Sequence, residues 1–136
     1  MTSLLSRNFL LLAFFGSPLL FGNKSGSQNA IVKEIQSVGQ NQFMVLDFVE
    51  IRDCNCDSGI KIVNENKKLR RFHFTNNSKI WLLKNAGEYA EATLQQFMDA
   101  RAGNHFGWGF DAETPFEFRF DSAGKKILEM RQVYLP

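Results

Sequence analysis

Two cysteines, Cys54 and Cys56, are the residues whose types and spacing most directly suggest chemistry. A Cys-x-Cys pair can close a small disulfide ring, and strained rings are the more easily reduced ones. The pair therefore allows a redox or isomerase-like dithiol. The flanking carboxylates of Asp53 and Asp57 oppose this role, because nearby negative charge disfavours the reactive thiolate. We favour a possible disulfide that braces a turn between Cys54 and Cys56.

A metal site would have to combine these cysteines with the two histidines, His73 and His105. Structural zinc sites usually take four ligands from two closely spaced pairs. This chain has one cysteine pair and two histidines that lie far apart in the sequence. We therefore predict no metal site, and no motif indicates a cofactor.

A loop rich in glycine and aromatic residues precedes the last two expected strands. Phe106, Trp108 and Phe110 alternate there with Gly107 and Gly109. Exposed aromatic side chains make good contact surfaces for a sugar or a peptide. The same loop could instead close one end of a barrel. Among the candidate sites, these three aromatic residues are our prediction for ligand binding.

A basic run suggests a nucleic-acid site at first sight: Lys67, Lys68, Arg70 and Arg71. Small β-barrels bind single strands in a basic groove that carries aromatic side chains. Glu65 lies beside the run, however, and the charge balance of the expected domain is neutral. A solvated hairpin is the better interpretation, and we predict no nucleic-acid partner.

Asp47 is an isolated carboxylate within an apolar strand. A buried carboxylate without a partner is costly, so we expect a pairing with Arg119 or Arg131 across the barrel. An acid–base pair with Glu50 is the alternative. No Ser/His/Asp arrangement or phosphate-binding loop accompanies this pair. The sequence thus contains no recognisable catalytic constellation.

The N-terminus has the pattern of a secretory signal. Arg7 precedes an apolar run of 13 residues from Phe9 to Phe21, whereas a membrane-spanning helix needs about 20. A basic start, a short apolar run and a small polar tail are typical of signal peptides. We predict a signal peptide over 1–27 and one domain over 28–136, with cleavage after Ala30 as the alternative to cleavage after Ser27. The protein is expected to be exported, to the periplasm or outside the cell, with no transmembrane segment in the mature chain.

Removal of the signal changes the charge balance. The whole chain has 16 Lys and Arg against 14 Asp and Glu, but Arg7 and Lys24 leave with the signal. The mature domain then carries equal numbers of acidic and basic residues. Such a domain has no global field that would draw it to nucleic acid or to an anionic membrane.

Short strands and one helix are expected in the mature chain. Phe116, Phe118 and Phe120 alternate with charged residues, as in a half-buried strand. Thr93 and Gln96 fit a capping box at the start of a helix. Further strands are expected at 31–38, 43–52, 60–63, 69–75, 79–83 and 127–135, with a turn at 76–78. This order predicts a mainly β fold with one helix (α+β), a small antiparallel, partly open OB-like barrel.

Three motifs resemble a group of small exported bacterial proteins of unknown function. They are a D-x-V-E strand at 47–50, an I-V-N-x-N-x-x-L-R hairpin at 62–70 and a Q-x-Y-L-P chain end at 132–136. The resemblance implies an exported, mainly β module in bacteria, and it brings no catalytic residues.

These observations predict a non-enzymatic exported module that binds an unknown protein or glycan, or that acts in the cell envelope. Two alternatives stay open. One is a redox or metal-binding protein that uses Cys54 and Cys56. The other is an OB-type domain that binds an oligosaccharide or an oligonucleotide.

Overall fold

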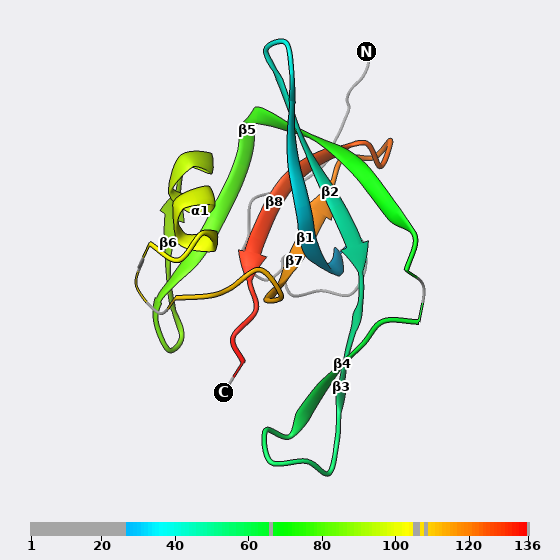
Figure 1. Cartoon of the computed structure of the whole chain (residues 1–136), viewed down its shortest axis with the longest axis vertical. Helices are drawn as coiled ribbons and strands as arrows, with labels where there is room; N and C mark the ends of the chain where they lie inside the picture. Colours follow the sequence, from blue (N-terminus) through cyan, green and yellow to red (C-terminus); the bar gives the residue numbers. More distant parts are fainter. Residues whose placement is uncertain (1–26, 66, 105–106, 108, 136) are drawn as a thin grey trace.

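The structure is a computed structural model that describes residues 27–65, 67–104, 107 and 109–135 (Figure 1). Apart from Ser27, the predicted signal peptide lies outside these residues. The elements in chain order are β1 Ser27–Val38, β2 Asn41–Phe48, β3 Glu50–Asp53, β4 Ile60–Val63, β5 Leu69–Asn85, β6 Glu88–Ala92, α1 Leu94–Arg101, β7 Pro115–Phe120 and β8 Lys126–Gln132.

Five strands form a barrel. They are hydrogen-bonded in the order β2-β1-β7-β8-β5, and β2 also pairs with β5, which closes the ring. The sixth strand, β6, extends the sheet beyond β5. The helix α1 follows β6 and comes before β7, so it connects the third barrel strand to the fourth. The predicted mainly β, α+β barrel of OB type is confirmed.

Two details of the barrel differ from the expectation. The ring is closed rather than partly open, and one pair of neighbours, β5 and β8, is parallel. The parallel pair arises because β8 lies between β7 and β5. A hairpin turn makes β8 antiparallel to β7. Because β7 runs in the direction opposite to β5, β8 runs parallel to β5. The alternation of apolar and polar residues within a single strand does not indicate which strands become neighbours or in which direction they run.

Two expected strands differ from the prediction in where they are interrupted. The strand expected over 43–52 is interrupted at Val49, whose N–H donates to the carbonyl of Asn29 at 3.0 Å. The turn expected at 76–78 instead lies within β5, where the register with β8 shifts between Phe74 and Lys79. The hydroxyl of Ser78 accepts from the backbone N–H of Thr75 and donates to a carbonyl of β8. Side-chain hydrogen bonds thus replace the missing backbone partners of this bulge.

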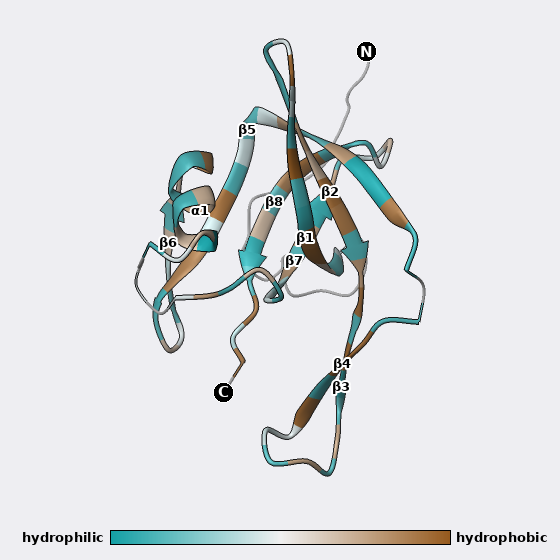
Figure 2. Cartoon of the chain, viewed as in Figure 1, coloured by the Kyte–Doolittle hydropathy of each residue, from teal (hydrophilic) through white to brown (hydrophobic). Residues whose placement is uncertain are grey.

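The core fills the barrel. Apolar and polar residues alternate along its strands (Figure 2), so that one face of each strand is buried. The helix closes part of the core with Phe97, and its start is fixed by the predicted capping box. Gln96 N–H donates to the Thr93 hydroxyl at 3.0 Å, and Thr93 N–H donates to the Gln96 side chain at 2.8 Å. The buried core residues are Ala30, Val32, Met44, Leu46, Phe72, Ile80, Leu82, Ala92, Phe97, Phe116, Phe118, Ile127 and Met130.

A two-stranded hairpin, which we call the arm, projects from the barrel (Figure 1). It consists of β3 and β4, which pair only with each other. Isolated hairpins of this size are marginally stable in water. A disulfide between Cys54 and Cys56 braces the tip, together with hydrogen bonds between the backbones of Cys54 and Gly59 and of Cys56 and Gly59.

In the part of the chain that the structure describes, no helix has the length and apolar character needed to cross a membrane.

Candidate functional site

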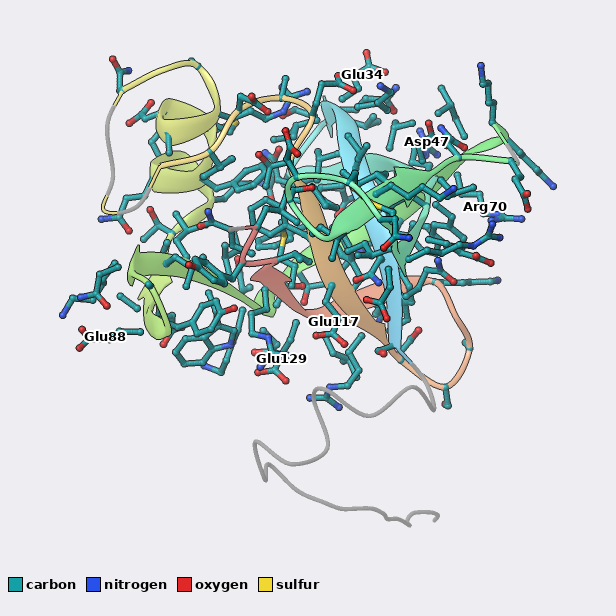
Figure 3. All side chains as sticks on the ribbon, turned by 90° about the horizontal axis from the view of Figure 1, so that it is seen from below. Glu34, Asp47, Arg70, Glu88, Glu117 and Glu129 are labelled. Atoms are coloured by element: carbon teal, nitrogen blue, oxygen red, sulfur yellow. A yellow bond between two sulfur atoms is a disulfide. The ribbon has the colours of Figure 1, made fainter. Side chains whose placement is uncertain are left out.

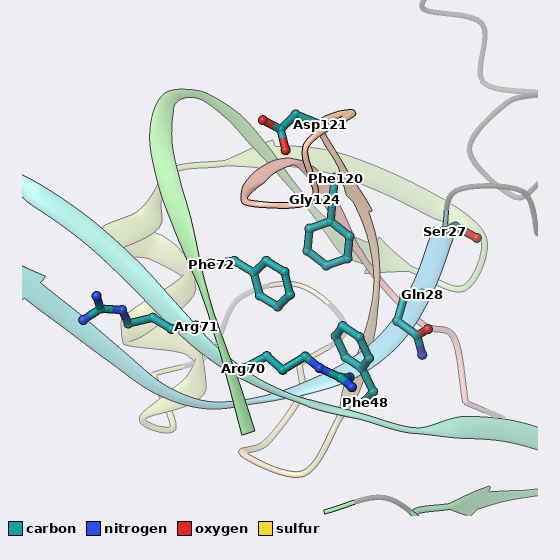
Figure 4. Close-up of a pocket in the computed structure, with 9 residues that line it drawn as sticks. All are labelled: Ser27, Gln28, Phe48, Arg70, Arg71, Phe72, Phe120, Asp121 and Gly124. Carbon is teal, nitrogen blue, oxygen red and sulfur yellow. The ribbon is translucent and has the colours of Figure 1, made fainter. Parts of the chain in front are cut away.

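One end of the barrel is open and forms a hollow of about 600 Å³, which we call the mouth (Figure 4). It is bounded by the start of β1, the end of β2, the start of β5 and the turn between β7 and β8. Its lining residues are Ser27, Gln28, Phe48, Arg70, Arg71, Phe72, Phe120, Asp121 and Gly124.

Strand alternation brings the aromatic residues of the mouth together. Met44 and Leu46 of β2 are fully buried in the barrel, and Phe48 is the next residue on that face. Across the pairing with β5, Phe72 is opposite Met44 and Arg70 is opposite Leu46. Cross-strand partners point to the same side of a sheet, so Arg70 and Phe72 also face inward.

Three phenylalanine rings make the apolar wall of the mouth. The rings of Phe72 and Phe120 stack with centroids 4.3 Å apart, and Phe48 stacks on Phe72 at 5.9 Å. Phe72 is buried, whereas Phe48 and Phe120 are half-buried. The cluster therefore belongs to the core on its inner side and offers aromatic surface on its outer side.

Arg70 supplies the positive charge of the mouth. Its guanidinium lies 4.5 Å from the centre of the Phe48 ring, and Figure 4 shows it pointing toward that ring. A guanidinium that stacks on a ring keeps its N–H donors at its edge, where they can bind a carboxylate in a bidentate manner. No ion pair with a carboxylate involves Arg70 among the described residues.

Asp121 is the acidic residue of the lining, and it has a structural task. Its carboxylate accepts backbone hydrogen bonds from Lys125 at 2.9 Å and from Lys126 at 3.0 Å, which fixes the turn between β7 and β8. In Figure 4 it lies across the mouth from Arg70. The two opposite charges thus occupy separate parts of the rim.

The opposite face of the same two strands carries a second stack, which we call the outer stack. It consists of Phe43, His73 and Arg71. The Phe43 and His73 rings are 5.0 Å apart, and the Arg71 guanidinium lies 4.3 Å from the centre of the Phe43 ring. Arg71 also donates to the Gln36 side chain at 3.4 Å. Although Arg71 borders the mouth, its side chain points away from the three rings (Figure 4).

Asp47 is buried, with 4% of its surface exposed, but the predicted arginine partner is wrong. Its carboxylate accepts a hydrogen bond from the side-chain amide of Asn64 at 2.7 Å. Asn64 directly follows β4, so this bond attaches the base of the arm to the barrel.

The two arginines proposed for Asp47 are occupied elsewhere. Arg119 pairs with Glu129, and Arg131 pairs with Glu117 at 2.7 Å. These pairs connect neighbouring positions of β7 and β8 on the outer surface of the barrel. Figure 3 shows Glu117 and Glu129 away from Asp47. Strand alternation placed the four charged residues on the outside, and the order of the strands separated them from Asp47.

Only part of the predicted aromatic loop can be placed. Phe106 and Trp108 lie outside the described residues. Phe110 is half-buried and packs against the core, 5.4 Å from the ring of Phe97 and 5.2 Å from that of Phe116. Gly107 has a φ of +53°, and a Cβ there would lie 2.5 Å from the carbonyl oxygen of Leu83. Gly107 therefore lies close to the backbone of β5, and Phe110 packs against α1 and β7. Ligand binding by Phe106, Trp108 and Phe110 stays a prediction.

The other candidate residues do not come together. Cys54 and Cys56 form the disulfide at the tip of the arm, whereas His73 belongs to the outer stack. Within the described ranges, no group of three or more His, Cys, Asp or Glu side chains could hold a metal ion. His105 lies outside those ranges. The redox and metal alternatives for Cys54 and Cys56 stay untested predictions.

Comparison of the chain with models of protein families, with curated proteins and with solved structures found no match. The resemblance to small exported bacterial proteins therefore stays a prediction.

Sequence reasoning missed most of the mouth. The sequence pattern does not mark Gln28, Phe48 or Phe120 as candidate residues, and it favours a solvated hairpin for Arg70. One signal was present: Arg70 shares the face of β5 with Phe72 and Phe74, so it stands at the start of an inward-facing aromatic row. An arginine in such a position has to lie at the end of a barrel, where its charge can reach water.

Proposed function

We propose that this protein is an exported binding module that takes a ring-shaped ligand, a sugar residue of a glycan, at the mouth. The observation that carries the proposal is the wall of Phe48, Phe72 and Phe120 beside the guanidinium of Arg70. Ligand sites are typically concave and mostly apolar, with a few polar groups that set the orientation of the ligand. The mouth joins three phenylalanine rings with the polar residues Ser27, Gln28, Arg70, Arg71 and Asp121. Of its two arginines, Arg70 points toward the rings.

Size supports a small ligand. The hollow of about 600 Å³ falls within the range of roughly 300–1,000 Å³ for small-molecule sites. A single strand of nucleic acid would need a continuous basic track with several stacking rings. In the described chain the three rings have one cation that points toward them. A sugar unit satisfies the geometry better than an oligonucleotide.

The proposal of export continues from the signal-like N-terminus. The pairing of β1 favours cleavage after Ser27, because Ala30 is paired with both Phe48 and Phe116. Cleavage after Ala30 would remove these contacts and Gln28 of the mouth. The test is N-terminal sequencing of protein recovered from the periplasm or the medium. We expect Gln28 as the first residue, and a cytosolic chain that starts at Met1 would contradict export.

An array of immobilised neutral and acidic oligosaccharides tests the binding function. We expect wild-type protein to bind a subset of them and Phe48→Ala to lose that binding. Phe43→Ala is the matched control, since it removes a ring that also stacks with an arginine but lies on the opposite face of the same strand. Absence of glycan binding would refute the proposal, as would binding that Phe43→Ala abolishes and Phe48→Ala preserves.

A further inference from the structure

Arg70 adds a chemical requirement to the ligand of the mouth. Among the described residues, Arg70 stacks on the Phe48 ring and takes part in no ion pair. All seven ion pairs there use other residues, and the arginines on β7 and β8 each have a glutamate partner. Arg70 thus differs from them in stacking on a ring without an ion pair of its own. Glu50 and Glu65 border the adjoining hollow together with Arg70, but both carboxylates pair with Arg52.

The position of Arg70 determines where an anionic group would bind. The side chain starts from the inward face of β5, next to Phe72, and crosses toward Phe48 at the rim (Figure 4). A ring that packs against the phenylalanine wall would therefore place one edge beside the guanidinium. The planar, two-pronged donor geometry of arginine matches a carboxylate in the plane of that edge.

We infer that the mouth selects a uronic acid, a sugar residue whose ring bears a carboxylate. The inference rests on the proposed glycan-binding function and names the class of sugar. The apolar side of the sugar ring would pack on Phe48 and Phe120, and its carboxylate would bind Arg70. Asp121 sharpens this orientation, because its negative charge lies across the mouth and repels a carboxylate placed the wrong way round.

Neutralising the ligand's charge without changing its ring tests the inference. The probes are tri-galacturonic acid and its fully methyl-esterified form, each titrated into the mature protein by isothermal calorimetry. Loss of a charge-assisted bidentate contact typically costs a factor of about ten or more in affinity. We expect the ester to bind wild type at least about tenfold more weakly than the acid.

Two variants locate the effect at Arg70. In Arg70→Ala the acid and the ester should bind with similar affinity, since the group that distinguishes them is gone. In Lys79→Ala, a control that removes an exposed cation of β5 outside the mouth, the preference for the acid should remain as in wild type. Circular dichroism confirms that each variant is folded before titration.

The outcomes separate this inference from the function on which it rests. Equal binding of the acid and the ester to wild type would overturn the inference of a uronic acid ligand. A preference for the acid that persists in Arg70→Ala would overturn it as well. If only neutral oligosaccharides bind and Phe48→Ala abolishes that binding, glycan binding at the mouth stands and the uronic acid fails. If no oligosaccharide binds, or none depends on Phe48, both fail.

Discussion

Strands β2 and β5 carry two arginine–phenylalanine stacks that differ in the face they occupy. Arg70 lies 4.5 Å from the centre of the Phe48 ring, and Arg71 lies 4.3 Å from that of Phe43. The local geometry is nearly the same, although consecutive arginines on a strand point to opposite sides. The inner stack borders a hollow that two more phenylalanines line, whereas the outer stack lies on the barrel surface with His73 and Gln36 as neighbours.

The difference shows that an arginine–aromatic contact does not by itself make a binding site. In the outer stack, Arg71 already has partners within the protein: it stacks on the Phe43 ring and donates a hydrogen bond to the Gln36 side chain. The inner stack becomes a site through the concave wall around it.

Removing an inner ring should have the largest effect. Phe72→Ala deletes a buried side chain that contacts both Phe48 and Phe120, and such deletions cost about 3–5 kcal/mol of unfolding free energy. Phe43→Ala should cost about 1 kcal/mol of unfolding free energy, since its ring is only half-buried. Urea denaturation of both variants measures the difference. Equal losses would show that the two stacks do not differ in burial as described.

Asp47→Ala should have the next largest effect on stability. It leaves the half-buried side-chain amide of Asn64 without its acceptor at 2.7 Å, and a donor left unsatisfied in this way costs about 1–3 kcal/mol. Asn64→Ala is the control, and the double variant should lose less than the sum of the two single losses. Thermal denaturation checks this. Additive losses would mean that the bond between arm and barrel contributes nothing.

The two arginines should separate binding from stability. Arg70→Ala is expected to weaken binding of an acidic trisaccharide about tenfold, and Arg71→Ala to leave it within about twofold, because only Arg70 points into the mouth. Each variant loses one cation–π contact, so both should be destabilised by no more than about 1 kcal/mol. Calorimetric titration and denaturation of the same samples measure both quantities. Similar losses of affinity in the two variants would show that the two faces do not differ in ligand binding.

Removing the disulfide should have the smallest effect. A Cys54→Ser, Cys56→Ser variant opens a very short loop, so the gain in unfolded-state entropy is small. The arm pairs with no barrel strand in the described structure, and we expect the midpoint of global unfolding and the binding affinity to be nearly unchanged. Amide hydrogen exchange should rise in the arm alone. Loss of binding would give Cys54 and Cys56 a functional role at the mouth.

Local sequence patterns predicted local structure well. The alternation of Phe116, Phe118 and Phe120 and the capping box at Thr93 correctly indicated a strand and a helix start, because both depend on residues a few positions apart. The parallel pairing of β5 with β8 could not be predicted, since it depends on which strands become neighbours after the helix. The partner of Asp47 was missed for the same reason. Asn64 comes close to Asp47 only because β4 pairs with β3 and brings the chain back to the barrel.

The candidate site was harder to predict than the fold. Aromatic residues close in sequence drew attention to the loop at 106–110, where Phe110 packs into the core. The mouth instead combines residues from β1, β2, β5 and β7, which are up to about 90 positions apart. A concave site of this kind exists only once the barrel is closed. Sequence spacing alone does not reveal it.

Chemical-shift mapping tests most directly the claim that the mouth, and not the outer stack, is the ligand site. Tri-galacturonic acid would be titrated into isotopically labelled mature protein, and the backbone amide signals would be followed. We expect the largest shifts to cluster at Gln28, Phe48, 70–72 and 120–124, while the signals of Gln36 and Phe43 stay unchanged. Shifts concentrated at Gln36, Phe43 and His73 would place the site on the outer face and contradict the account.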